Sequence, residues 1–218
     1  MNPFVCFLLT CAFIDKCYLI GDNVVSKHFT KFNMFSNDRK LYILKNLIKG
    51  FNLCILVLLS LVLLLPDLMK NNWNNTYIKC FASMYVANDA IGLMKLKNMK
   101  PSTQMHHIVT ILFMIYSWSV DFNTSNIGRL LFVYTLSSAM TGTVNIYLGL
   151  RWIYKDVDNI IRDTVKYQYL FICLFNWIYQ CLHWESSLEG HIYILLLIWI
   201  IVDDVILLNW LWNTKIKQ

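Results

Sequence analysis

Long apolar blocks alternate with short polar segments along most of the chain. The blocks fall at about 3–20, 41–66, 77–95, 105–121, 127–149, 167–183 and 191–213. Each is close to the roughly 20 apolar residues that a helix needs to cross a bilayer. Because a spanning segment has to satisfy its own backbone hydrogen bonds, the pattern predicts helices rather than strands. We therefore expect an all-α integral membrane protein, built as a bundle of about seven transmembrane helices.

Composition supports this class and excludes others. The 218 residues are 57% hydrophobic and 15% charged, whereas soluble domains average about 45–50% and about 25%. The net charge of +6 does not indicate nucleic-acid binding, because the basic residues are scattered between apolar blocks. The seven cysteines form no CxxC pair, so the sequence predicts neither a disulfide framework nor a thiolate metal site.

Basic residues gather in alternate loops, which predicts an orientation. They are Lys27, Lys31, Arg39, Lys40 and Lys45, then Lys95, Lys97 and Lys100, then Arg151, Lys155, Arg162 and Lys166, and finally Lys215 and Lys217. Basic loops face the cytosol, so we expect a lumenal N-terminus and a cytosolic C-terminus. Glycosylation sequons at Asn74 and Asn123 fall in the base-poor loops, as this orientation requires. The chain divides into a first helix and loop (1–39), a multi-pass domain (40–213) and a short cytosolic tail (214–218).

Ionisable residues at membrane depth are candidates for function, because they are expensive there. Asp89 lies six residues before Lys95, a depth of ~9 Å at ~1.5 Å per residue. His106 and His107 follow Pro101 by five and six residues, and Asn145 precedes Arg151 by six. Three helices should therefore bring polar groups to one level.

Several neighbours share helix faces with these groups. Ser138, Thr141 and Asn145 have i, i+3, i+7 spacing, Tyr85 lies one turn from Asp89, and Thr110 lies one turn from His106. Adjacent histidines are ~100° apart on a helix, so we expect one to face the bundle and the other its flank. Plainer alternatives stay open. The histidines can be interfacial, hydroxyls can bond their own backbone, and Asp203 with Asp204 can be a structural pair.

The segments YVANDAIGL, MHHIVTILF, TLSSAMTGTVNIYLGLRW and LLNWLW together resemble the TLC domain. This domain is shared by ceramide synthases, translocating-chain-associating membrane proteins and TLC-domain lipid regulators, and the resemblance covers about 40–213. It implies a helical bundle enclosing a lipid-accommodating cavity, usually in the endoplasmic reticulum, with catalytic roles for His106 and His107. The next helix carries no acid, where ceramide synthases have paired aspartates, and Thr135 stands where non-synthase members often have Glu. The chain is therefore closer to the non-synthase members.

Acyl-CoA-dependent acyl transfer to a lipid amine or hydroxyl is the leading hypothesis. One imidazole would act as base or acyl acceptor, and Asp89 would hold its tautomer. Asn145 and the Ser138/Thr141 stripe would donate to the oxyanion. The substrate-binding set is Tyr85, Thr110, Ser138, Thr141, Asn145, Arg151 and Asp203. Lys95, Lys97, Lys100 and Arg151 would meet the phosphates of acyl-CoA.

Other interpretations remain beside this one. A non-catalytic regulator or carrier of membrane lipids would use the same cavity without turnover. A b-type haem would need spaced histidines, and the other candidates, His183 and His191, fall near the opposite membrane face. The set His183, Glu185, Glu189 and His191 reads as an ordinary polar turn rather than a metal site. We expect membrane lipids as partners and acyl-CoA as a co-substrate. We expect neither a bound metal nor nucleic-acid binding, and the chain is compatible with homo- or hetero-dimers.

Overall fold

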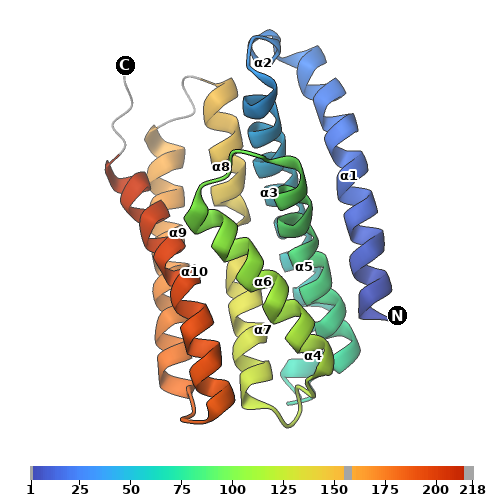
Figure 1. Ribbon diagram of the computed structural model, residues 1–218, viewed down its shortest axis with the longest axis vertical. Coiled ribbons are helices and arrows are strands. Elements are labelled where there is room, and N and C mark those ends of the chain that lie inside the picture. Colours follow the sequence, from blue (N-terminus) through green and yellow to red (C-terminus); the bar gives the residue numbers. More distant parts are fainter. Residues whose placement is uncertain (1, 155–158, 214–218) are drawn as a thin grey trace.

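The computed structural model describes residues 2–154 and 159–213, and every regular element within them is an α-helix. The elements are α1 (Pro3–His28), α2 (Thr30–Asn33), α3 (Asn37–Leu63), α4 (Leu65–Leu68), α5 (Asn75–Lys95), α6 (Pro101–Ser119), α7 (Asn126–Ala139), α8 (Gly142–Ile153), α9 (Asn159–His183) and α10 (Leu188–Asn213). The long helices run up and down beside one another, and α6 crosses the others obliquely (Figure 1). The all-α prediction is confirmed.

Three helices, α1, α3 and α10, are long and apolar enough to cross a membrane. Their outer faces expose large apolar side chains, such as Leu9, Leu58 and Leu195. Such faces suit contact with lipid rather than water. Helices α5, α6 and α9 carry polar side chains on faces buried inside the bundle, including Asp89, His107 and Gln180, and α3 does so as well with Lys45 and Lys49.

Local sequence signals set the helix starts. The Asn2 side chain accepts a hydrogen bond from the Phe4 amide at 2.8 Å, and Pro3 takes the first position of α1. The Ser125 hydroxyl accepts from the Gly128 amide at 3.1 Å at the start of α7. Helix α6 begins at Pro101, as predicted. Proline suits the first position of a helix because the backbone N–H that it lacks would have no hydrogen-bond partner there.

The predicted continuous helix over 127–149 is wrong, because the segment divides into α7 and α8. Thr141 donates its hydroxyl to the Ser138 carbonyl at 2.7 Å at the interruption. A hydroxyl bonded in this way competes with the helical ladder. The three residues Ser138, Thr141 and Asn145 therefore do not share one face of a continuous helix.

Small residues let α8 approach α3 closely next to this interruption. A methyl group on Gly142 would lie 2.9 Å from the Gly50 carbonyl oxygen, and one on Gly50 would lie 2.6 Å from Ile146 Cγ1. A methyl group on Gly149 would lie 2.7 Å from Leu47 Cγ. These contacts are too short for any larger side chain without movement of the backbone. The glycines therefore fix the distance between α3 and α8.

The loops divide between two ends of the bundle. At the basic end, Asn98 donates to Asp38 at 2.8 Å, and the Arg39 guanidinium lies 3.7 Å from the centre of the Trp152 ring. At the opposite end, the segments 69–74 and 120–125 are joined by the Asn123 side chain, which bonds the backbone of Trp73. Alternate loops thus lie at opposite ends. Lys155, Lys215, Lys217 and the predicted tail 214–218 lie outside the described residues.

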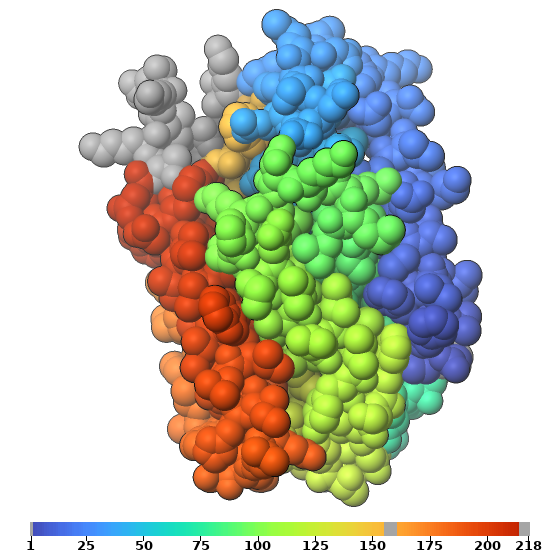
Figure 2. Space-filling view, viewed as in Figure 1, coloured from blue at the N-terminus to red at the C-terminus, as the bar shows by residue number. Residues whose placement is uncertain are grey.

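Side chains fill the spaces between most of the ribbons. In the space-filling view, the side chains of α6 (green) and α10 (red) meet across the face shown (Figure 2). Two buried clusters include side chains of these helices. One contains Phe81, Met114 and Phe132, and the other contains Phe113 and Leu197. The basic end differs, because a cavity opens there.

Candidate functional site

A cavity of about 540 Å³ lies within the basic end of the bundle. Its polar wall includes Lys45, Lys49, His106, His107, Asn145 and Asp203; its apolar wall includes Leu148, Ile172, Leu207 and Trp210; and its rim includes Arg39, Lys97, Lys100 and Arg151. The volume lies in the range of ~300–1,000 Å³ that is typical of small-molecule sites. Polar and apolar walls facing one space suit an amphiphilic ligand.

His107 lies at the centre of a buried polar chain. Its side chain is 2% exposed, and its Nδ1 lies 3.0 Å from Oδ1 of Asp89, close enough for a hydrogen bond but not aligned as one. Its Nε2 lies 3.1 Å from Nζ of Lys45. Asp89 is fully buried and also accepts bonds from the Lys49 ammonium and, at 3.1 Å, from the Thr110 hydroxyl. The ring therefore bridges a carboxylate and an amine.

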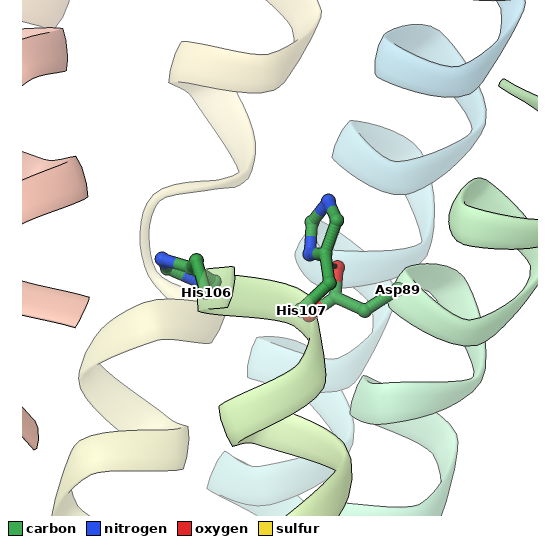
Figure 3. A group of neighbouring side chains, drawn as sticks. All are labelled: Asp89, His106 and His107. Carbon is green, nitrogen blue, oxygen red and sulfur yellow. Dashed lines mark ion pairs between the residues drawn. The ribbon is translucent and has the colours of Figure 1, made fainter. Parts of the chain in front are cut away.

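His106 faces a different way from its neighbour. The two rings are nearly perpendicular, with an interplanar angle of 79° and centroids 5.6 Å apart. His107 stands beside Asp89, whereas His106 points away from it (Figure 3). Nδ1 of His106 lies 3.4 Å from Oδ2 of Asp203, again close but not aligned as a hydrogen bond. The other oxygen of Asp203 accepts from the Thr103 hydroxyl at 3.1 Å. The expected divergence of the pair is confirmed, and His106, 13% exposed, is the more accessible ring.

Most of the predicted site residues meet at this cavity. Those that line it are His106, His107, Tyr85, Ser138, Thr141, Asn145, Arg151 and Asp203. The polar groups of α5, α6 and α8 thus lie at one level, as the depth comparison predicted. Ser138, Thr141 and Asn145 all line the cavity even though α7 and α8 are separate helices.

Two predicted placements are wrong, whereas Asp89 lies beside the His107 imidazole as predicted, behind that ring rather than in the cavity lining. Thr110 does not line the cavity, because it points its hydroxyl at the Asp89 carboxylate. Lys95 does not reach the rim, because its ammonium pairs with Asp15 of α1 at 2.6 Å. Asp15 thus serves the packing of α1 against α5 rather than the site.

The sequence reasoning missed the two lysines of the polar wall. The loop pattern places Lys45 among the basic loop residues and gives Lys49 no role, although both fall within the apolar block 41–66. Their i, i+4 spacing places them on one face of α3. Two ammonium groups one turn apart inside an apolar block were the available signal. Tyr169 is a further cavity residue that the sequence did not single out, and its hydroxyl donates to Asp204 at 2.7 Å.

Asp89, His106 and His107 offer three ligand atoms within 4.8 Å of one another, which is close enough to surround a metal ion. However, the Lys49 ammonium occupies an oxygen of Asp89, and Lys45 occupies Nε2 of His107. A dication there would have to displace or repel two ammonium groups, so the geometry disfavours a metal. His183 and His191 bond the carbonyls of Tyr179 and Ser187 at the opposite end, away from the paired histidines.

No family model, curated protein or solved structure matches this chain. The functional assignment therefore rests on the chemistry of the cavity. A partly accessible imidazole with a carboxylate partner can take a proton from a bound amine or hydroxyl. A buried imidazole between a carboxylate and an amine can move a proton along that chain.

Proposed function

We propose that this chain is a multi-pass membrane enzyme of lipid metabolism with a TLC-like fold of about seven spans. It would transfer an acyl group from acyl-CoA to a lipid amine or hydroxyl. The observation that carries the proposal is the His106 side chain, which faces a cavity with an apolar wall and has Asp203 as its carboxylate partner. Such a pair is the arrangement that activates a weak nucleophile.

The steps follow from the placement of each group. His106 takes the proton of the attacking amine or hydroxyl as the new bond to the acyl carbon forms, and Asp203 stabilises the resulting imidazolium. The C–S bond of the thioester then breaks, His106 returns the proton to the sulfur, and CoA leaves as the thiol. Asn145 lines the same cavity, and its side-chain amide is the donor for the oxyanion, whereas the Thr141 hydroxyl is bonded to the Ser138 carbonyl. The acyl chain lies along the apolar wall, and Lys97, Lys100 and Arg151 at the rim meet the phosphates of acyl-CoA.

The same proposal includes an orientation and a compartment. The rim is basic, and basic loops face the cytosol, where acyl-CoA is found. We therefore place the rim and the C-terminus in the cytosol, the N-terminus in the lumen, and the protein in the endoplasmic reticulum. Protease added to intact microsomes should remove an epitope fused after Gln218 and spare one fused before Met1. The reverse pattern contradicts the orientation.

Comparative lipidomics tests the activity. Cells expressing the wild type should gain or lose one acyl-lipid class, and His106→Gln should reduce that change by about a hundredfold, the usual scale for a general base. Asp203→Asn should reduce it less. The matched control is His183→Gln, a histidine at the opposite end, which should behave as the wild type. All variants are compared at equal abundance and equal melting temperature.

A second function is separated by the same experiment. A non-catalytic regulator or carrier of membrane lipids would use the amphiphilic cavity but not the proton transfer. If His106→Gln and the double variant His106→Ala/His107→Ala shift lipids as the wild type does, the acyl-transfer proposal is wrong and the carrier function is supported. If the wild type shifts no lipid class, both functions lose their support in that host.

A further inference from the structure

Two lysines one turn apart on α3 have different partners. The Lys49 ammonium bonds the Asp89 carboxylate, and its charge is thereby compensated. Nζ of Lys45 instead has Nε2 of His107 at 3.1 Å. Among residues 2–154 and 159–213, Lys45 forms no ion pair with a carboxylate. Lys45 is 8% exposed and lines the cavity.

Lys45 therefore stands at the end of an ordered chain of proton-transfer groups. Asp89 faces Nδ1 of the His107 ring at 3.0 Å, which leaves Nε2 for the Lys45 amine. The carboxylate–imidazole–nucleophile order is the one that activates a hydroxyl in a catalytic triad, with an amine in the nucleophile position. Lysines removed from water and from acidic partners are the ones that attack carbonyl carbon.

We propose that Lys45 is a covalent site for a long-chain aldehyde, which it binds reversibly as an imine. This activity goes beyond acyl transfer and uses a different nucleophile. His107 first takes a proton from the Lys45 ammonium. The free amine then attacks the carbonyl carbon, a C–N bond forms, and the attacking nitrogen passes one of its protons to the carbonyl oxygen to give a carbinolamine. The C–O bond breaks, the oxygen leaves as water with the proton returned by His107, and a protonated C=N bond remains. No oxidant or reductant is consumed.

The cavity favours an aldehyde on a long chain over other electrophiles. The same cavity is lined by Leu148, Ile172 and Leu207, and these apolar side chains would cover an alkyl tail. A thioester carbonyl that reached Lys45 would form a stable amide and end the use of the site after one event, so the acyl transfer proposed above requires that carbonyl to lie beside His106 rather than Lys45. An aldehyde condenses and is released by water, so the site can be used again.

The test uses the full-length chain in lipid nanodiscs with hexadecanal and sodium cyanoborohydride. The reductant converts an imine into a stable secondary amine, and peptide mass spectrometry then locates the alkyl group. We expect it on Lys45 and not on Lys79, a partly buried lysine at the opposite end whose ammonium bonds the Trp118 carbonyl. His107→Ala should slow labelling of Lys45 by about a hundredfold, because the proton acceptor is lost. His183→Ala serves as the matched control and should label at the wild-type rate.

Several outcomes would overturn the proposal. Alkylation confined to rim lysines such as Lys97 and Lys100 would show only general amine reactivity. If Lys45 is labelled equally in a folded His107→Ala protein, His107 does not transfer the proton. If propanal and hexadecanal label Lys45 equally, the site does not select a long-chain aldehyde. If the variants fail to fold, the peptide map of the wild type alone decides the site. Failure here leaves the acyl-transfer proposal standing, because that activity is read through His106.

Discussion

The two ends of the bundle are both rich in polar side chains, but they use them differently. At the end that holds segments 69–74 and 120–125, the Asn75 amide donates to Asp121 at 2.7 Å and its oxygen accepts from the Phe122 amide at 2.9 Å. The polar groups there satisfy loop backbone and one another. At the basic end, His106 and Lys45 face a cavity instead. Polar residues that close a loop act in folding, whereas polar residues that face a cavity are available for chemistry.

The buried ion pair beneath the cavity should give the largest effect on stability. Asp89→Leu leaves the Lys49 ammonium buried without its carboxylate, and removal of one partner of a buried pair costs about 3–5 kcal/mol. Thermal unfolding in nanodiscs measures the loss. The double variant Asp89→Leu/Lys49→Met should recover much of the stability, because no unpaired charge remains. A double variant as unstable as the single one would contradict the pairing.

The close contact of α3 with α8 should give the next effect. Gly50→Ala places a methyl group 2.8 Å from the Gly142 carbonyl oxygen, so the helices have to separate. Overpacking of this kind typically costs about 1–3 kcal/mol. The control is Gly21→Ala, whose methyl group meets only flexible side-chain ends, Leu44 Cδ2 at 3.2 Å and Ile48 Cδ1 at 4.0 Å. The two variants should differ in melting temperature, and equal melting temperatures would contradict the close crossing.

At the opposite end, Asn75→Ala should have a smaller and more local effect. The variant leaves the Phe122 amide without its acceptor, a loss of about 1 kcal/mol, and also removes the exposed hydrogen bond to Asp121, which contributes less. Hydrogen exchange should quicken in 120–125 and stay unchanged around His107. Faster exchange at the cavity would mean that the two ends are coupled, and the comparison between them would have to be abandoned.

The smallest effect should come from acid at this same end. The Asn75 side-chain amide and the Asn123 backbone amide hold the pKa of the exposed Asp121 carboxyl below its ordinary value of 3.8. A carboxyl with a lowered pKa stabilises the folded state at pH values above its ordinary pKa. This stabilisation is lost as the pH falls through the lowered pKa of the folded state. The melting temperature should therefore fall slightly below about pH 4. Asp121→Asn should remove that part of the pH dependence, and an unchanged pH profile would contradict it.

Much of the site could be predicted from spacing along the chain. The depths of Asp89, His107 and Asn145 relative to the ends of their blocks placed them at one level, because the rise of a helix is constant. Pro101 marked the start of α6, and the alternation of basic loops marked the two ends of the bundle. These inferences depend only on near neighbours in the sequence. The same rules misplaced Lys95 and Lys45, because a basic residue near the end of a block reads as part of a loop.

By itself, then, the sequence determined the helical class, the apolar outer faces and the set of polar residues at membrane depth. These features follow from composition and from the spacing of apolar residues, which depend only on near neighbours in the chain. Only the tertiary structure decided which of these groups meet. It separated His106 with Asp203 from His107 with Asp89, paired Lys49 and left Lys45 beside an imidazole, and interrupted the helix over 127–149. Such partnerships depend on the distances between helices that are remote in sequence. Those distances are set by packing, as where Gly50 and Gly142 bring α3 against α8.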